Sequence, residues 1–252
     1  NLSPDHLDRY DGYEGYMASK ARLFDMQTPK QHSVFGKGDE DTARIYREIL
    51  ARRGPAVVHQ ADPAKVHGQE EWPSLQGPHN LQNVAVAIAL VEALGISEAQ
   101  WRPALRSFKG LEHRMEIVAT RNGVLFVNDS KATNAASTAP ALAAYPRIHW
   151  IVGGLAKSDN LNECAPNFGH VVKAYTIGES GPLFTKLLSP LMPVESSEMM
   201  GAAVCSAASQ AQPGDVIMLS PACASFDQFK DFEARGDAFK AIVEALPTGL
   251  GA

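Results

Sequence analysis

The sequence predicts an α/β fold whose second half forms a mostly parallel sheet with helices on both faces. From residue 124 onward, short apolar runs typical of strands alternate with segments of helical pattern, and such alternation indicates a parallel sheet. Three of these runs are followed at once by clusters of polar residues, which is where an α/β sheet places its ligand chemistry. Together the two observations favour a Rossmann-like second half.

The composition sets bounds on the fold and on the class of function. The 252 residues are 45% hydrophobic and 20% charged, enough for one large packed domain or two modest ones. A net charge of −5 argues against a nucleic-acid-binding surface, although local lysines can still bind phosphates. The longest apolar run, residues 84–91, is too short to span a membrane. Three cysteines without metal-site spacing favour a reduced, cytoplasmic protein.

The first 109 residues are predicted to be mixed and irregular. Gly95 is placed to end one helix, and Ser97 to cap the next, in which Pro103 predicts a kink or a shorter helix. The predicted helices cover residues 13–24, 40–53, 81–94 and 97–108, and a short strand covers residues 56–59.

After Lys109 the pattern changes, so a domain boundary is expected there, between residues 1–109 and residues 110–252. Asn122-Gly123 is a strong turn signal and predicts a hairpin. The predicted strands cover residues 115–120, 124–128, 148–152, 172–177 and 216–219, and the predicted helices cover residues 182–188, 199–210 and 227–246.

Three polar segments follow three of the predicted strands: residues 129–134, 153–159 and 220–225. Parallel strands share a direction, so their carboxyl ends share one edge of the sheet. All three segments should therefore face one crevice. Polar loops are common without any function, but two lysines and an aspartate on one edge favour a ligand site.

Two of these segments also carry a resemblance to a known family. They are Asn128-Asp129-Ser130-Lys131-Ala132-Thr133-Asn134 and Ser220-Pro221-Ala222-Cys223-Ala224-Ser225-Phe226-Asp227-Gln228-Phe229. Both resemble the Mur ligases, and among these the members that add D-glutamate to a peptidoglycan precursor. The resemblance covers essentially the whole chain. It implies that residues 1–109 are the later part of an α/β ATP-binding central domain and residues 110–252 a C-terminal domain that binds D-glutamate.

The resemblance implies a cytoplasmic, monomeric enzyme that uses ATP and Mg²⁺ and has no nucleic-acid partner and no membrane insertion. Its reaction would join D-glutamate to UDP-N-acetylmuramoyl-L-alanine through an acyl phosphate. Because the chain begins at Asn1, we expect it to be a piece of something longer.

The resemblance assigns four residues to D-glutamate. Lys157 and Thr133 would hold its α-carboxylate through charge-assisted hydrogen bonds, and Ser225 and the backbone of Phe232 would hold its side-chain carboxylate. Ser225 also stands where the last helix is predicted to begin, so it could be a plain N-cap, and both roles are compatible. The ring of Phe232 is expected in the core, at helical spacing from Phe229.

Four residues are assigned to ATP in the same way. Asp129 would hydrogen-bond the ribose, and Asn83 would lie near the adenine. Arg114 resembles an arginine at the domain hinge that contacts the nucleotide, and Lys131 a catalytic lysine close to the phosphates. Without the resemblance, each would be interpreted as a surface or capping residue.

The metal residues rest on the resemblance alone. His6 resembles a histidine that helps to bind Mg²⁺, and Lys20 a lysine that becomes carbamylated; both are expected to contribute to catalysis with Lys131. Carbamylation converts an ammonium group into an anionic oxygen ligand, which suits Mg²⁺. From the residues alone, Lys20 would be a solvated helix lysine.

One family feature is missing, and alternatives remain open. The phosphate-binding loop G-x-x-x-x-G-K-[ST] is absent, and residues 36–39 are too short a match, so the isolated chain is expected to be almost inactive. A sibling ligase or a folylpolyglutamate synthase is the nearest alternative, although the D-N-P-R type motif of the diamino-acid ligases is absent. A non-catalytic binding module is disfavoured because the polar edge residues are retained.

Overall fold

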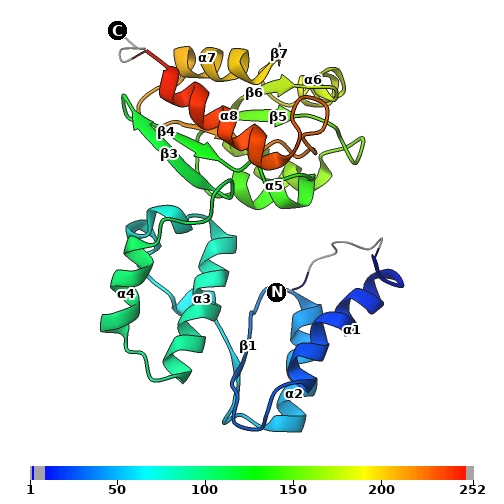
Figure 1. Ribbon diagram of the computed structural model, residues 1–252, viewed down its shortest axis with the longest axis vertical. Helices are drawn as coiled ribbons and strands as arrows, with labels where there is room; N and C mark the ends of the chain where they lie inside the picture. The colour runs from blue at the N-terminus through cyan, green and yellow to red at the C-terminus, as the bar shows by residue number, and fades with distance from the viewer. Residues whose placement is uncertain (1, 3–8, 248–252) are drawn as a thin grey trace. The chain divides into compact units, whose positions relative to one another are not determined.

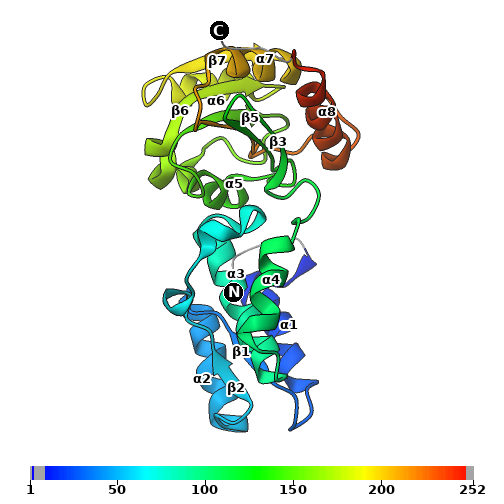
Figure 2. The same cartoon turned by 90° about the vertical axis from the view of Figure 1, so that its left-hand side faces the viewer.

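The computed structural model describes residue 2 and residues 9–247. The chain divides into two compact units (Figures 1 and 2). The first consists of Asn1–Leu75 and His79–Phe108, and the second of Gln76–Pro78 and Lys109–Ala252. His6 lies outside the described residues. Within residue 2 and residues 9–247, no helix has both the length and the apolar content needed to cross a membrane.

The first unit is mostly helical and contains one two-stranded parallel sheet, β1 with β2. Asp39 caps α2 by accepting a hydrogen bond from the amide of Thr42 at 2.6 Å, and Gly54, with a φ of 82°, ends it. The elements in chain order are α1 (Gly12–Asp25), β1 (Ser33–Phe35), α2 (Glu40–Arg53), β2 (Val58–Gln60), η2 (Pro63–Lys65), η3 (Gln69–Glu71), η4 (Pro73–Leu75), α3 (Pro78–Ala93) and α4 (Glu98–Ser107).

The predicted ends of α3 and α4 are present in the structure. Gly95, with a φ of 85°, follows α3, and its amide donates to the carbonyl of Glu92 at 2.9 Å. Ser97 caps α4 in a capping box, in which its amide donates to Gln100 Oε1 at 3.0 Å. The expected shortening at Pro103 does not occur, because α4 continues past it.

The second unit is built on a six-stranded sheet in the order β3-β4-β8-β5-β6-β7. β3 runs antiparallel to β4 and forms the predicted hairpin, whereas the other four neighbouring pairs are parallel. The prediction of a mostly parallel α/β sheet is confirmed. The elements are β3 (Glu116–Arg121), β4 (Val124–Asn128), α5 (Ala135–Leu142), β5 (Ile148–Gly153), η5 (Asn162–His170), β6 (Val171–Ile177), α6 (Gly181–Leu188), β7 (Val194–Glu198), α7 (Met200–Gln210), β8 (Val216–Leu219) and α8 (Phe232–Ala245).

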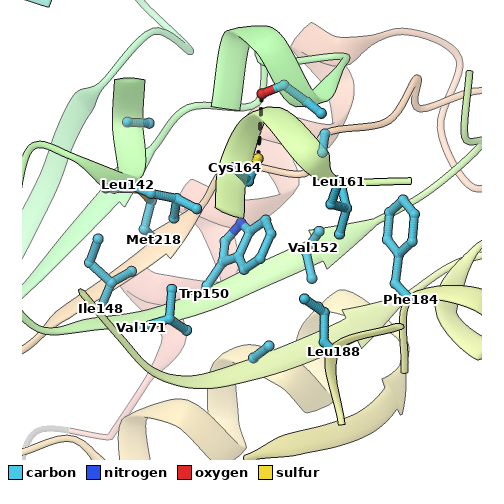
Figure 3. Packing of buried hydrophobic residues seen from close by; sticks show 14 of the residues in the cluster. Leu142, Ile148, Trp150, Val152, Leu161, Cys164, Val171, Phe184, Leu188 and Met218 are labelled. Atoms are coloured by element: carbon cyan, nitrogen blue, oxygen red, sulfur yellow. Dashed lines mark hydrogen bonds between the residues drawn. The ribbon is translucent and has the colours of Figure 1, made fainter. Parts of the chain in front are cut away.

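Helices cover both faces of this sheet, as predicted (Figure 1). Successive residues of a strand point to opposite faces. Trp150 of β5 therefore packs in the cluster that holds Leu142 of α5, and Ile151 packs in the cluster that holds Val204 of α7 and Phe239 of α8. Figure 3 shows the first cluster around the indole of Trp150. Because both faces are apolar, the central strands β4, β8 and β5 are rich in apolar residues.

The last helix differs from its prediction. α8 begins at Phe232 instead of residue 227, because Asp231 is the N-cap and accepts from the amide of Ala234 at 2.7 Å. The carboxylate of Asp227 instead accepts from the amide of Glu179 at 2.9 Å. The proposed role of Ser225 as the N-cap of this helix is therefore wrong.

Candidate ligand site at the carboxyl edge of the sheet

The three polar segments follow β4, β8 and β5, which are neighbours in the sheet. Their carboxyl ends therefore lie side by side, as the sequence predicted. Several contacts join the segments. Ser220 Oγ donates to Asp129 Oδ2 at 2.8 Å, and Leu155 forms an isolated bridge with Ala224. We call these three segments the carboxyl edge: residues 129–134, 153–159 and 220–225.

Lys157 and Thr133 meet at the carboxyl edge. Lys157 Nζ lies 3.5 Å from Thr133 Oγ1, although the two residues come from different segments. Lys157 is exposed, and it makes no ion pair with any residue in the described part of the chain. Thr133 lies directly before Asn134, the N-cap of α5, where the helix dipole favours negative charge. An ammonium group and a hydroxyl group are therefore available together for an anion.

Ser225 lies at the same edge but points inward. It is 1% exposed, and its Oγ has no hydrogen-bond partner among the described residues. Its carbonyl accepts from the amide of Phe229 at 2.8 Å and from that of Gln228 at 3.1 Å, closing a turn before α8. The structure thus places Ser225 near the carboxyl edge with an unused hydroxyl group.

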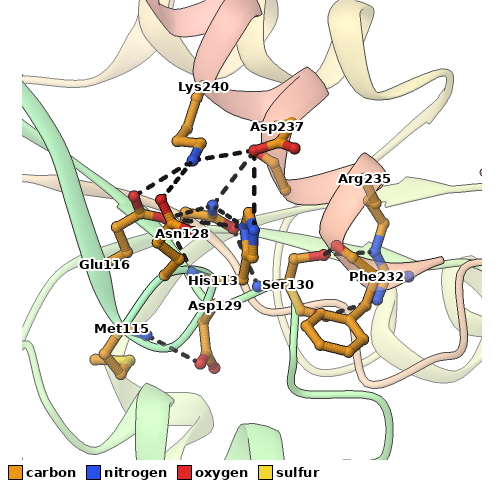
Figure 4. A network of polar contacts seen from close by, with 12 residues as sticks. His113, Met115, Glu116, Asn128, Asp129, Ser130, Phe232, Arg235, Asp237 and Lys240 are labelled. Carbon is orange, nitrogen blue, oxygen red and sulfur yellow. Dashed lines mark hydrogen bonds and ion pairs between the residues drawn. The ribbon is translucent and has the colours of Figure 1, made fainter. Parts of the chain in front are cut away.

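Phe232 is the first residue of α8 and is half-buried. Its carbonyl accepts from Ser130 Oγ at 2.8 Å. Its ring meets the ring of His113 edge-on, with centroids 6.1 Å apart, and Lys131 Nζ lies 5.2 Å from its centroid (Figure 4). The expectation of a core ring at helical spacing from Phe229 is wrong, because Phe229 lies outside the helix.

Asp129 is a buried carboxylate with two internal partners. It is 4% exposed, and its two carboxylate oxygens accept from Ser220 Oγ at 2.8 Å and from the amide of Met115 at 3.2 Å. Burial raises the pKa of Asp129 to about 7, although these hydrogen bonds and the charge of Arg114 oppose the rise. Here Asp129 holds the segment around Met115 against the sheet.

That segment, residues 113–115, is strained and firmly held. His113 and Met115 have φ values of 61° and 49°, in the left-handed region that favours glycine. The amide of Lys131 donates to the carbonyl of His113 at 2.9 Å. The side chains of Arg114 and Lys131 remain exposed, so two cations are free to meet an anionic ligand from solvent.

A polar network beside this segment was not predicted. The side-chain Nδ2 of Asn128 donates to Glu116 Oε2 at 2.9 Å and to the carbonyl of Gly236 at 3.3 Å, and it lies 3.1 Å from His113 Nδ1. Lys240 of α8 forms an ion pair with Glu116 at 3.5 Å. Figure 4 shows how the network joins β3, the end of β4 and α8. The sequence indicated a role for Asn128 only through its place at the start of the polar segment of residues 128–134.

Arg235 is the second residue that the sequence reasoning missed. It is 1% exposed, and its guanidinium donates to Ser130 Oγ at 3.0 Å, to the carbonyl of Ser130 at 2.8 Å and to that of Cys223 at 3.0 Å. The available signal was an arginine on the apolar face of a helix, at helical spacing from Phe239.

The remaining assigned residues belong to the first unit. Asn83 is exposed on α3, and its Nδ2 lies 3.5 Å from Asn80 Oδ1. Lys20 is exposed on α1, with Nζ 5.2 Å from the ring centroid of Tyr16. No three His, Cys, Asp or Glu side chains gather as a metal site within the part of the chain that is described, which leaves out His6.

The second unit is an α/β domain with polar side chains gathered at one edge of a mostly parallel sheet. Two family models then identify the chain. The Mur ligase middle domain matches residues 1–71, and the glutamate ligase domain of the Mur ligases matches residues 113–223. The chain therefore belongs to the Mur ligase family.

Three relatives of this chain carry the same protein name. UDP-N-acetylmuramoylalanine--D-glutamate ligase of Novosphingobium aromaticivorans is 69% identical over 246 residues, covering 98% of this chain and 56% of that protein. The enzymes of the same name from Sphingopyxis alaskensis and Zymomonas mobilis are 50% and 49% identical, with 98% of this chain and 57% and 55% of those proteins covered. The chain thus spans a little over half the length of these relatives.

Solved structures agree on the fold. The D-alanyl-D-alanyl-adding ligase of Acinetobacter baumannii superposes with a TM-score of 0.64 at 14% identity, covering 97% of this chain and 57% of that chain. FolC of E. coli superposes with a TM-score of 0.60 at 18% identity, covering 96% of this chain and 60% of that chain. At such low identity these likenesses concern the fold alone.

Proposed function

We propose that the full-length protein containing this chain joins D-glutamate to UDP-N-acetylmuramoyl-L-alanine with the consumption of ATP, as a monomer in the cytoplasm. The first unit is proposed to be part of the ATP-binding domain, and the second unit to bind D-glutamate. Support comes from the names of the relatives at 69%, 50% and 49% identity. Further support comes from the chemistry of the carboxyl edge.

The proposed reaction has two steps. The carboxylate of UDP-N-acetylmuramoyl-L-alanine takes the γ-phosphoryl group of ATP, leaving ADP. The amine of D-glutamate then attacks the acyl phosphate, an amide bond forms, and phosphate leaves with the amine proton transferred to solvent. The site must therefore anchor a dicarboxylate and must place cations near the phosphates.

The single observation that carries the proposal is the pairing of Lys157 with Thr133. Their side chains approach to 3.5 Å across two segments of the carboxyl edge, and neither is engaged with a carboxylate in the described residues. An ammonium group with a neighbouring hydroxyl group suits the α-carboxylate of an amino acid. Ser225, whose hydroxyl group is unused, and the backbone of Phe232 are proposed for the second carboxylate.

The residues proposed for ATP differ in how well their exposure suits contact with a nucleotide. The exposed side chains of Arg114 and Lys131 suit nucleotide phosphates, and exposed Asn83 suits a base. Asp129 is proposed for the ribose, and its carboxylate, which is buried and accepts two internal hydrogen bonds, has acceptor sites left over. We propose that Asp129 also positions the segment that carries Arg114.

Mg²⁺ would neutralise phosphate charge when bound. Lys20 and His6 remain the proposed ligands, with Lys20 as a carbamate. The ammonium group of Lys20 is exposed, so carbon dioxide can reach it.

A phosphate-release assay on the full-length protein tests the proposal. We expect turnover with ATP, UDP-N-acetylmuramoyl-L-alanine and D-glutamate, and none when L-alanine or a diamino acid replaces D-glutamate. Loss of one charge-assisted hydrogen bond, about 1.5–3 kcal/mol, should raise the KM for D-glutamate by about 10- to 150-fold in K157A. K186A, which removes an exposed lysine on α6, is the matched control and should change little.

The assay also separates the alternatives. Turnover with a different amino acid would indicate a sibling ligase, and no turnover with any amino acid would indicate a binding module. The 252-residue chain alone should be almost inactive. Robust turnover by this chain alone would show that the parts of the ATP site that we expect outside it are not needed.

A further inference from the structure

We propose that Arg235 is a positioning residue that supplies a buried positive charge to the carboxyl edge, and that this charge makes the site prefer an amino acid with a side-chain carboxylate over its neutral amide. The inference rests on the proposed function. It adds the residue whose charge makes the site distinguish a negatively charged substrate side chain from a neutral one.

The guanidinium of Arg235 lies where all three segments of the carboxyl edge meet. It binds Ser130, after β4, through Oγ at 3.0 Å and the carbonyl at 2.8 Å. It binds the carbonyl of Cys223, after β8, at 3.0 Å. A Cβ added to Gly154, after β5, would lie 3.2 Å from Arg235 Nη1. Figure 4 shows the side chain reaching from α8 to Ser130.

The charge of Arg235 has no close counter-charge. Arg235 forms no ion pair with any residue in 9–247, and its Nη1 has no hydrogen-bond partner there. The charge of Asp227 raises the pKa of Arg235, but the Asp227 carboxylate accepts a hydrogen bond from the amide of Glu179 at 2.9 Å. Burial lowers the pKa of Arg235 to about 10, opposed by Cys223 and Asp227, so the group stays protonated at neutral pH. A buried unpaired charge is costly for folding, so its presence calls for an explanation.

Of the two residues proposed for the side-chain carboxylate, Phe232 is linked to this charge through Ser130, and Ser225 follows Cys223, another contact of Arg235, in the chain. Ser130 Oγ, which accepts from Arg235 Nε, donates to the carbonyl of Phe232 at 2.8 Å. Ser225, two residues after Cys223, is 1% exposed and has an unpartnered Oγ. We infer that a carboxylate bound at Ser225 would bring a negative charge toward this positive one, which has no ion-pair partner among residues 9–247. Their attraction is strong because protein, rather than water, surrounds the arginine. Arg235 need not touch the ligand.

A comparison of D-glutamate with D-glutamine tests this inference, because the two differ by one charge and have nearly the same shape. KM values for both are measured in the phosphate-release assay with wild type, R235Q and the control R121Q. Arg121 also donates to backbone carbonyls, those of Leu246 at 2.7 Å and Glu244 at 3.1 Å, but at the far end of α8. R121Q therefore matches the loss of arginine–carbonyl hydrogen bonds without changing the carboxyl edge.

We expect wild type and R121Q to prefer D-glutamate strongly. R235Q should lose at least tenfold of this preference, equivalent to about 1.4 kcal/mol, mainly through a higher KM for D-glutamate. An equal loss for both amino acids would mean that Arg235 is only structural, and an unchanged preference would also overturn the inference while leaving the proposed function intact. A wild-type protein that uses neither amino acid would overturn both.

A second measurement on the wild-type protein is independent of whether R235Q folds. The Arg235 Nε–H group, which donates to Ser130 Oγ, gives its own NMR resonance. Adding D-glutamate at a saturating concentration should shift this resonance, and D-glutamine should shift it by less than half as much. Equal shifts with the two ligands, or none with D-glutamate, would contradict the inference.

Discussion

Gly236 offers a sharp test of the packing between α8 and the segment at residues 113–115. It lies in the interior of α8, where replacing Gly by Ala normally stabilises a helix by about 0.8–1 kcal/mol. Here, however, an added Cβ would fall well inside van der Waals contact with His113 Nδ1 and 3.0 Å from Asn128 Nδ2. Helix propensity therefore predicts that G236A raises the free energy of unfolding, whereas packing predicts that it lowers it.

The magnitudes favour destabilisation. Overpacking a closed site costs about 1–3 kcal/mol, and displacing the ring of His113 also disturbs its contact with Asn128, worth about 1 kcal/mol. The ring has little room to move, because His113 is 5% exposed and lies against Phe232. After subtracting the gain in helix propensity, we expect G236A to lower the free energy of unfolding by about 1–3 kcal/mol.

The assay is scanning calorimetry of wild type, G236A and the control G201A. An added Cβ at Gly201 of α7 would meet Ile242 Cδ1 at 3.9 Å, an ordinary contact, so G201A should raise the Tm. G236A should lower the Tm of the same transition, by about 2–4 °C for each kcal/mol. On an H113A background most of the loss should disappear, because the clashing ring is gone and only the contact with Asn128 Nδ2 at 3.0 Å is left. If G236A melts at or above wild type, the steric argument is wrong.

Two further predictions concern stability and pH. Burial lowers the pKa of His149 below its usual 6.5, although Asp215 opposes this, so the folded protein keeps His149 neutral while the unfolded chain takes up a proton. Stability should therefore fall as the pH drops from about 7 to 5, and urea midpoints of H149Q should show a flatter dependence; identical slopes would argue against burial as the cause. L142A removes a fully buried side chain of α5 and should cost about 2–5 kcal/mol, whereas L183A, at a residue 37% exposed, should cost far less; equal losses would contradict the assigned burial.

The elements predicted best are those whose sequence signals mark both ends. α2 has the predicted bounds, Glu40–Arg53, because Asp39 caps it and Gly54 ends it. β7 (Val194–Glu198) was missed because it has one apolar residue in five and forms only by pairing with β6 at the edge of the sheet. α5 was missed as well, since it is short and contains Pro140.

For the candidate site, the sequence predicted where the residues lie but not how they are presented. The direction of parallel strands is enough to bring Thr133 and Lys157 to one edge. The burial of Asp129 and Ser225 depends on partners distant in the chain and could not be predicted locally. The Arg235–Ser130 contact, for example, joins residues 105 positions apart.

The six-stranded sheet also affects how this protein can be handled at the bench. Both of its faces are covered by helices that come after Lys109, and every residue proposed here for D-glutamate lies in that same stretch. A gene segment encoding residues 109–252 should therefore yield a compact reagent for screening libraries of small diacids.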